Sequence, residues 1–200
     1  MKIFCIGRNY SEHAKELNNA LPEAPVVFMK PPTALLKGNE FYLPEFSTDM
    51  HYECELVYRI GKNGKHIAAA FANKYIDAVT VGIDFTARDL QSEQKKKGLP
   101  WEIAKAFDNS AVTGHFTPLN NSDEPLQFSM QKNGTTVQSG ISTDMLYSVP
   151  LIIEYISKFF TLQQGDLLFT GTPAGVGAVA IGDKLTGFLG AEKRFEIEIK

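Results

Sequence analysis

Three acidic residues could together hold a divalent cation. Glu53 and Glu55 are two apart in a run with strand character, so their side chains point to one face of the strand. Neighbouring carboxylates repel, and a hard ion such as Mg²⁺, which prefers oxygen ligands, relieves that repulsion. A solvated strand face is the simpler alternative for this pair. Asp84 follows the apolar run 78–83 and could either join the site or cap a helix that begins near Thr86.

Three other residues could move protons or bind anions. His13 and Glu16 are three apart in an expected helix over 9–17, which places them on one helical face. A carboxylate that accepts a hydrogen bond from one imidazole nitrogen raises the basicity of the other, as a general base requires; an ordinary surface pair is the alternative. Lys105 lies in an apolar stretch, where a lysine either extends its head toward solvent or pairs with an anion.

Two short segments are open to more than one interpretation. The glycine-rich turn 171–177 could present backbone N–H groups to a carboxylate or could simply form a tight corner, and it lacks the residue order of a phosphate-binding P-loop. The three consecutive lysines at 95–97 are interpreted as a solvated helix end, where the helix dipole favours cations.

Most of the secondary structure predicted around these residues is β-strand. Strands are predicted over 2–6, 24–29, 53–60, 75–85, 166–170, 184–189 and 193–199, helices over 9–17, 86–97 and 142–160, and a hairpin over 127–138 around Asn133-Gly134. Strands outnumber helices and follow one another at the end of the chain. We therefore predict an α+β, β-rich fold with an antiparallel or mixed β core.

Composition excludes several classes of protein. The chain has 200 residues, of which 44% are hydrophobic and 22% charged, with a net charge of −3. One domain over 1–200 with a substantial core is expected, and an intrinsically disordered chain is excluded. No basic footprint for nucleic acid and no apolar run long enough for a membrane span is present. Cys5 and Cys54 are too few for a disulfide framework, which indicates a reducing cytoplasm.

Motifs along nearly the whole chain share their order and spacing with one enzyme family. They are Gly7-Arg8-Asn9-Tyr10 with His13 and Glu16, Glu53-x-Glu55, Gly82 to Gln91, Lys97 to Trp101 with Lys105, Asn133-Gly134 with Gln138, and Gly165 to Gly177. Together they resemble the fumarylacetoacetate hydrolase family. The resemblance is greatest to its short acylpyruvate hydrolase and oxaloacetate decarboxylase subgroup.

The resemblance implies a fold, an assembly and a set of site residues. It implies a mixed β-sandwich or roll of the family's C-terminal-domain type, a homodimer, and a lid formed by the first helix. The implied roles are Mg²⁺ or Mn²⁺ ligands for Glu53, Glu55 and Asp84, general base for His13 with Glu16, oxyanion contact for Lys105, and substrate binding for Arg8, Gln91 and Thr172.

The implied reaction is Mg²⁺-dependent hydrolysis of the C–C bond of acylpyruvates, decarboxylation of oxaloacetate, or both, through a metal-chelated α-keto acid and an enolate. The substrate would be a small α-keto or β-dicarbonyl acid. Isomerisation or decarboxylation of a homoprotocatechuate intermediate, and oxaloacetate tautomerisation, remain alternatives on the same scaffold. Two non-catalytic alternatives are a metal-dependent dicarboxylate-binding protein and a β-rich interaction module without a site.

Overall fold

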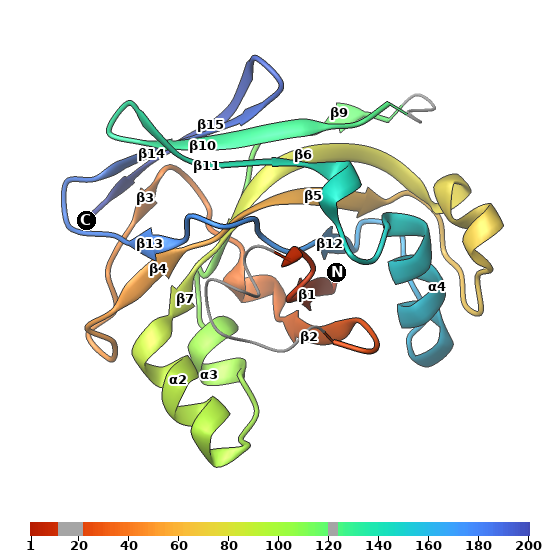
Figure 1. The fold of residues 1–200 in the computed structure, drawn as a ribbon, viewed down its shortest axis with the longest axis horizontal. Coiled ribbons are helices and arrows are strands. Elements are labelled where there is room, and N and C mark those ends of the chain that lie inside the picture. The colour runs from red at the N-terminus through yellow and green to blue at the C-terminus, as the bar shows by residue number, and fades with distance from the viewer. Residues whose placement is uncertain (12–21, 120–123) are drawn as a thin grey trace.

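A computed structural model describes residues 1–11, 22–119 and 124–200 (Figure 1). Most of the predicted helix over 9–17 lies outside these residues. The described chain forms three sheets with helices at their margins. This arrangement confirms the predicted α+β, β-rich fold class.

The largest sheet carries Glu55 and Asp84, and Glu53 directly precedes one of its strands. Its strand order is β2-β1-β12-β5-β6-β8, and β9 also pairs with β6. The pair β1–β12 is parallel and the other pairs are antiparallel, so the sheet is mixed. The strands are β1 Ile3–Gly7, β2 Val26–Lys30, β5 Cys54–Ile60, β6 Ile76–Asp84, β8 Ala111–Thr113, β9 Thr117–Pro118 and β12 Leu167–Phe169.

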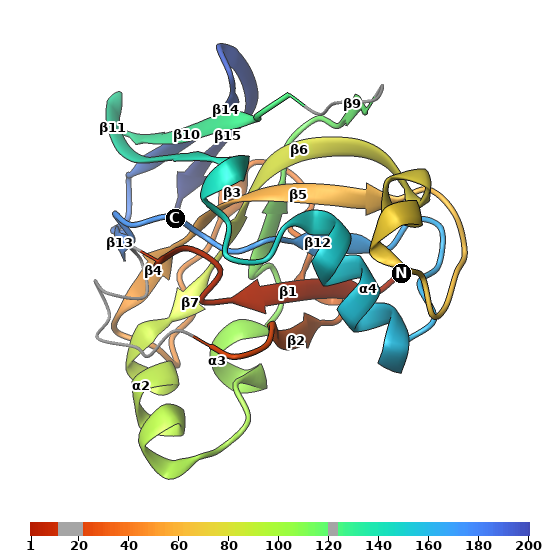
Figure 2. The same ribbon diagram turned by 45° about the vertical axis from the view of Figure 1, so that its right-hand side comes forward.

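The second sheet has the order β11-β10-β14-β15-β3. The predicted hairpin is confirmed as β10–β11, and both Asn133 and Gly134 adopt the positive φ that a tight two-residue turn requires. The strands of this sheet are β3 Glu40–Phe41, β10 Gln127–Lys132, β11 Thr135–Ile141, β14 Lys184–Leu189 and β15 Glu192–Ile199. Figure 2 shows β10, β11, β14 and β15 as a layer above the β5–β6 ribbon.

A small third sheet explains why the first described helix begins later than predicted. Its order is β13-β4-β7, with β4 over Met50–Tyr52, β7 over Thr86–Ala87 and β13 over Gly177–Ala178. Because residues 86 and 87 pair with β4, the helix starts only at residue 88. It ends, as predicted, at Lys97, and Gly98 follows in a left-handed conformation.

The helices of the described residues are few and peripheral. They are α2 Arg88–Lys97, α3 Glu102–Lys105 and α4 Val149–Phe159, with short 3-10 turns at Pro32–Ala34, Ala69–Tyr75 and Ser142–Asp144. The predicted helix over 142–160 is thus a short turn followed by α4, with Pro150 in the first turn, where its missing N–H costs nothing. Figure 1 shows α2 and α3 together at one end of the sheets and α4 at another.

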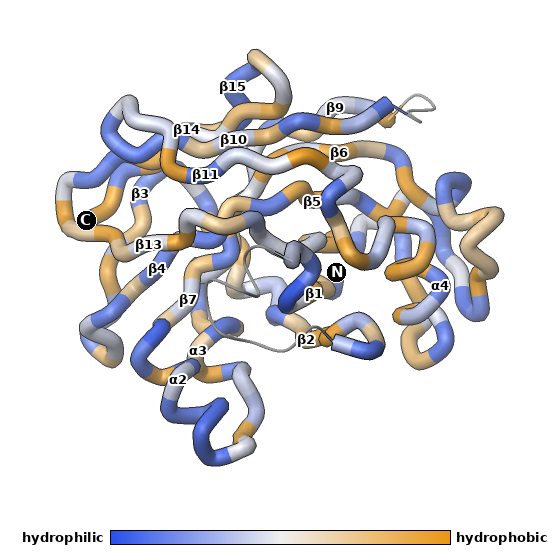
Figure 3. Tube along the Cα trace, viewed as in Figure 1, coloured by the Kyte–Doolittle hydropathy of each residue, from blue (hydrophilic) through white to orange (hydrophobic). Residues whose placement is uncertain are grey.

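The core lies between and within the sheets. Hydrophobic stretches follow the central strands in Figure 3, while α2 and the outer turns are largely hydrophilic. Cys5 and Cys54 are fully buried and not bonded to each other, as expected of small hydrophobic side chains. Among the described residues, no helix combines the length and apolar character needed to cross a bilayer.

Candidate active site

Strand register brings the three acidic residues together. In the β5–β6 pair, Glu55 lies opposite Gly82, and the pairing continues with a 2.8 Å hydrogen bond from Asp84 N to Glu53 O. Ligand oxygens of the three carboxylates all lie within 4.8 Å of one another, and the residues are 6%, 2% and 1% exposed. The predicted cluster is therefore present in the structure, whereas the interpretation of Asp84 as a helix cap is wrong, because α2 has no side-chain cap.

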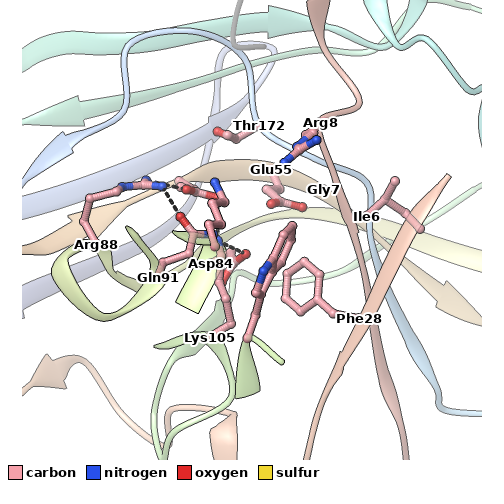
Figure 4. A pocket seen from close by; sticks show the side chains of 13 residues that line it. Ile6, Gly7, Arg8, Phe28, Glu55, Asp84, Arg88, Gln91, Lys105 and Thr172 are labelled. Carbon is pink, nitrogen blue, oxygen red and sulfur yellow. Dashed lines mark hydrogen bonds and ion pairs between the residues drawn. The ribbon is translucent and has the colours of Figure 1, made fainter. Parts of the chain in front are cut away.

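The three carboxylates face a small cavity of about 30 Å³ at the end of β1 (Figure 4). Its wall combines the acidic triad with cationic, polar and aromatic side chains from α2, α3, the segment between these helices, β2, and the turns that follow β1 and β12. The lining residues are Ile6, Gly7, Arg8, Phe28, Glu53, Glu55, Asp84, Arg88, Gln91, Lys95, Trp101, Lys105 and Thr172.

Lys105 joins two of the carboxylates. Its Nζ lies 2.8 Å from Glu53 Oε2, 2.8 Å from Asp84 Oδ2 and 2.6 Å from Thr86 Oγ1. Burial lowers the pKa of Lys105, but the two carboxylates outweigh that effect and raise the pKa above its usual value. Of the two predicted alternatives, anion pairing is confirmed. All three ammonium hydrogens have protein acceptors, so contact with a substrate oxyanion would require one of these bonds to be exchanged.

A second buried lysine, for which the sequence predicted no role, also faces Asp84. Lys30 Nζ lies 2.7 Å from Asp84 Oδ1, and its side chain is fully buried. Its hydrogen bonds go instead to Lys105 O, Ser110 O and Ser110 Oγ. Asp84 Oδ1 consequently has a neighbouring charge but accepts no hydrogen bond from the described residues. In the sequence, a lysine at the end of an apolar strand gives no signal that its ammonium group is buried.

The negative charge of Glu55 has fewer positive partners than those of Glu53 and Asp84 among the described residues. It accepts a 2.7 Å hydrogen bond from Gly171 N. Burial, together with the charges of Asp84 and Glu53, raises the pKa of Glu55 well above its usual value. Gly171 has a φ of +97°, and a Cβ there would lie 2.8 Å from Asn9 Cβ. The glycine-rich turn thus presents an N–H group to a carboxylate, as one of the two interpretations predicted, and the carboxylate is the protein's own.

The triad fits a hard divalent cation. Its donors are all carboxylate oxygens, the set that Mg²⁺ and Mn²⁺ prefer over softer nitrogen and sulfur ligands. Three buried carboxylates close together repel one another, and the groups around them satisfy them unevenly. Asp84 Oδ1 lies 2.7 Å from the Lys30 ammonium group but accepts no hydrogen bond from the described residues, and Glu55 accepts its hydrogen bond from the backbone, at Gly171 N. A bound cation would give both carboxylates a further positive partner.

One face of α2 extends the site. Arg88, Gln91 and Lys95 are three and then four residues apart, a spacing that places them on one helical face, and all three line the cavity. Arg88 Nη2 lies 2.5 Å from Glu53 Oε1, and Arg88 Nη1 donates a 2.7 Å hydrogen bond to Gln91 Oε1. This bond orients the Gln91 amide. Arg88 lies within the motif Gly82 to Gln91, but no role was predicted for it. Its i,i+3 spacing from Gln91 indicates that the two side chains share a helical face.

The interpretation of the lysine run as a solvated helix end is wrong for its first member. Lys95 lines the cavity, and its Nζ lies 5.4 Å from the centre of the Trp101 ring. The other two lysines of the run are exposed. Burial, together with the charges of Arg88 and Arg8, lowers the pKa of Lys95 to about 8.

The remaining predicted substrate contacts also line the cavity. Arg8 has a φ of +60°, rare for a side chain of its size, and Figure 4 shows its guanidinium group pointing toward Glu55. Its buried Nε has no hydrogen-bond partner among the described residues. Thr172 Oγ1 donates to Cys54 O and accepts from Gln138 Nε2, both at 2.8 Å. The Thr172 proton is therefore already engaged.

The predicted general base lies outside the described residues. His13 and Glu16 fall within 12–21, so their pairing stays a prediction. The chain that leads to them is tethered beside the site. Asn9 Nδ2 donates to Thr170 O at 2.8 Å and to Tyr147 O at 3.1 Å, and Asn9 Oδ1 accepts from Tyr147 N at 2.8 Å.

Several known proteins are similar to this chain in sequence and in fold. The family model described as "Fumarylacetoacetate (FAA) hydrolase C-terminal" matches residues 2–200. The mitochondrial oxaloacetate tautomerase FAHD1 of Arabidopsis thaliana is 41% identical, over 98% of this chain and 91% of the relative. The structure also resembles that of fumarylpyruvate hydrolase from Pseudomonas aeruginosa in complex with Mn²⁺ and pyruvate. Their TM-score is 0.93 at 36% identity, over 100% of this chain and 89% of that one.

An isomerase has a similar structure. The 5-carboxymethyl-2-hydroxymuconate delta-isomerase of Mycobacterium smegmatis has a TM-score of 0.86 at 32% identity, over 99% of this chain and 78% of that one. The proteins similar to this chain are therefore named as a hydrolase, a tautomerase and an isomerase. Each is similar to it over nearly its whole length.

Proposed function

This chain belongs to the fumarylacetoacetate hydrolase C-terminal family, and on that premise we propose that it is a Mg²⁺- or Mn²⁺-dependent enzyme acting on small β-dicarbonyl α-keto acids. The proposed reactions are hydrolysis of the C–C bond of acylpyruvates and decarboxylation of oxaloacetate. One observation carries the proposal: an oxygen-only triad of buried carboxylates, Glu53, Glu55 and Asp84, shares its cavity with the ammonium group of Lys105.

The triad would hold the metal ion, which when bound would act as a Lewis acid that draws electron density from the keto group of the substrate. Lys105 would place a second positive charge beside the oxygen on which negative charge develops. Because Lys105 is held between Glu53 and Asp84, its ammonium group is already in position before the reaction begins. Removing one preorganised group of this kind costs a factor of about 10² to 10³ in rate. Gln91, oriented by Arg88, would donate its amide N–H groups to the substrate.

The two reactions differ in their use of water. In hydrolysis, His13 with Glu16 would take a proton from water as its oxygen attacks the distal carbonyl carbon. The C–C bond then breaks, its electron pair passes to pyruvate as an enolate, and a proton completes pyruvate beside the released carboxylic acid. In decarboxylation, the C–C bond breaks without attack by water, CO₂ leaves, and the same enolate is protonated.

Oxaloacetate tautomerisation is a second candidate. It is favoured by the name of the plant relative, which is 41% identical to this chain. It requires only that a proton move between the C3 carbon and the C2 oxygen, so the charge placed by Lys105 would serve it equally. Both candidates would use the same enolate chemistry.

The proposal is tested with EDTA-treated protein. Loss of acetylpyruvate and of oxaloacetate is followed by ultraviolet absorbance with and without Mg²⁺ or Mn²⁺, corrected for the reaction of the metal alone, and the enol–keto interconversion of oxaloacetate is followed separately. Metal-dependent turnover is expected for the wild type and lost in Glu53→Gln. His13→Ala should abolish hydrolysis while leaving decarboxylation; equal loss of both would contradict water activation by His13. Metal-independent turnover would contradict the proposal itself.

Assembly and location stay predictions. A homodimer is proposed, and sedimentation equilibrium of the purified chain would test it. The cytoplasmic location predicted from the cysteine content is also a proposal, while the plant relative is named as mitochondrial.

A further inference from the structure

We propose that Lys95 binds the second carboxylate of a dicarboxylic substrate, so that the site selects α-keto diacids over α-keto monoacids. The inference rests on the proposed function for the α-keto end of the ligand and extends it to the opposite end. It concerns a residue that lies outside the acidic triad and is absent from the ion pairs that the described residues form with it.

The position of Lys95 on α2 suits this role. Arg88, at the start of the helix, contacts Glu53 of the triad, and Gln91 lies one turn further along. Lys95 follows after another turn on the same face, about 6 Å beyond Gln91 along the helix axis. It still lines the same cavity. A ligand whose α-keto end lies at the triad would therefore extend along this face, and a short diacid would bring its second carboxylate toward Lys95.

The surroundings of Lys95 hold its ammonium group in place without neutralising it. The Nζ lies over the ring of Trp101, whose centre is 5.9 Å from that of Phe28 in an edge-to-face arrangement. Trp101 also packs close to Gly7, where an added Cβ would be 3.4 Å from the indole ring. No carboxylate of the described residues forms an ion pair with Lys95. A half-buried ammonium group without an anion is unfavourable, and a bound carboxylate would compensate for it.

The net charge of the cavity lining also favours a dianionic ligand. Its lining contains three carboxylates and four cationic groups, and a divalent ion at the triad would add two further positive charges. Arg88 and Lys105 already contact triad carboxylates, whereas Arg8 and Lys95 have no such partner among the described residues. A monoanionic ligand would leave this excess of positive charge only partly neutralised, and a dianionic ligand neutralises more of it. Charge complementarity of this kind is a source of specificity.

Equilibrium binding tests the inference independently of turnover. Malate and lactate are matched 2-hydroxy acids that differ chiefly in the second carboxylate, and neither is a β-dicarbonyl compound. Their affinities for the Mg²⁺-loaded protein are measured by titration calorimetry for the wild type, Lys95→Met and Lys96→Met. Methionine keeps a flexible apolar stem that can pack on Trp101. Lys96 is the adjacent, exposed lysine of the same helix and serves as the control.

The wild type and Lys96→Met should prefer malate to lactate. In Lys95→Met, malate affinity should fall by about 10- to 100-fold, the effect of losing a charge-assisted hydrogen bond, while lactate affinity stays within about twofold. Lys95→Arg, which keeps the charge, should retain most of the preference. A wild type that does not bind malate or does not prefer it, or a Lys95→Met variant that keeps the preference, would overturn the inference.

Kinetics separate this inference from the proposed function. If oxaloacetate and acetylpyruvate are substrates, Lys95→Met should raise KM for the diacid and leave kcat/KM for the monoacid within about twofold of the wild type. If the wild type turns over neither compound yet prefers malate in a Lys95-dependent way, the proposed reactions are wrong and the role of Lys95 stands.

Discussion

Substituting Glu55 by glutamine should abolish stabilisation of the protein by Mg²⁺ without destabilising the metal-free protein. Glu55 is 2% exposed and lies beside two other carboxylates, so its negative charge is costly until a cation binds. Glutamine has nearly the same shape, and its carbonyl oxygen can still accept the hydrogen bond from Gly171 N. The substitution therefore removes one metal ligand and one repulsive charge but preserves the local contact.

The size of the effect follows from mass action. At a free Mg²⁺ concentration 100 times the dissociation constant, binding to the native state alone adds about 2.7 kcal/mol to the free energy of unfolding. For a chain of this length, 1 kcal/mol corresponds to about 2–4 °C in Tm. The wild type should thus gain about 5–11 °C with Mg²⁺. Glu55→Gln should gain less than about 2 °C, and its Tm in EDTA should equal or exceed that of the wild type.

The assay is thermal unfolding followed by circular dichroism in EDTA and at several Mg²⁺ concentrations. Glu45→Gln is the matched control, since Glu45 is exposed and away from the cavity lining; it should behave as the wild type does. Two results would refute the reasoning. A full Mg²⁺ shift in Glu55→Gln would show that Glu55 is not a ligand, and a Tm in EDTA well below that of the wild type would show that its charge is already compensated.

Two further predictions concern lysines at the site, the buried Lys30 and the half-buried Lys95. Lys30→Met removes the cation beside Asp84 and leaves buried carbonyl groups without a donor, so it should destabilise the protein by about 3–5 kcal/mol in urea unfolding; a loss below about 1 kcal/mol would contradict this. For Lys95, burial and the charges of Arg88 and Arg8 lower the pKa to about 8, so the ammonium form is complete only below that pH. Malate affinity should therefore fall as pH rises through about 8 in the wild type and stay flat in Lys95→Met, by calorimetry across that range.

The strands and the acidic pair were predictable because their causes are local. Alternation of apolar and polar residues sets the faces of β15, and the same period of two places Glu53 and Glu55 on one side of their strand. Asp84 was ambiguous because its role depends on register. A cap and a ligand at the end of β6 look alike in sequence, and only the pairing of β6 with β5 places Asp84 opposite Glu53.

The cationic residues were harder to predict because their burial depends on packing between distant segments. Lys30 ends one strand, yet its ammonium group lies among groups from residues 84, 105 and 110. Lys95 belongs to a run of three lysines whose members look alike in the sequence. The turn after Gly98 brings Trp101 back beneath Lys95, while the next two lysines face solvent. Helical spacing from Arg88 and Gln91 was the one local signal that separated Lys95 from its neighbours.

These cations explain how three carboxylates can be buried together at all. Without compensation, such a cluster would take up protons or open the structure to solvent. Lys105 and Lys30 each approach Asp84 from a different element, and Arg88 approaches Glu53, whereas Glu55 has only a backbone N–H among its described hydrogen-bond donors. The compensation is thus uneven, and it is weakest at Glu55, on the side where Arg8 points in from the cavity wall. An arrangement that stabilises the fold with lysines but leaves one carboxylate under-compensated favours a site that accepts a cation over a closed structural ion-pair network.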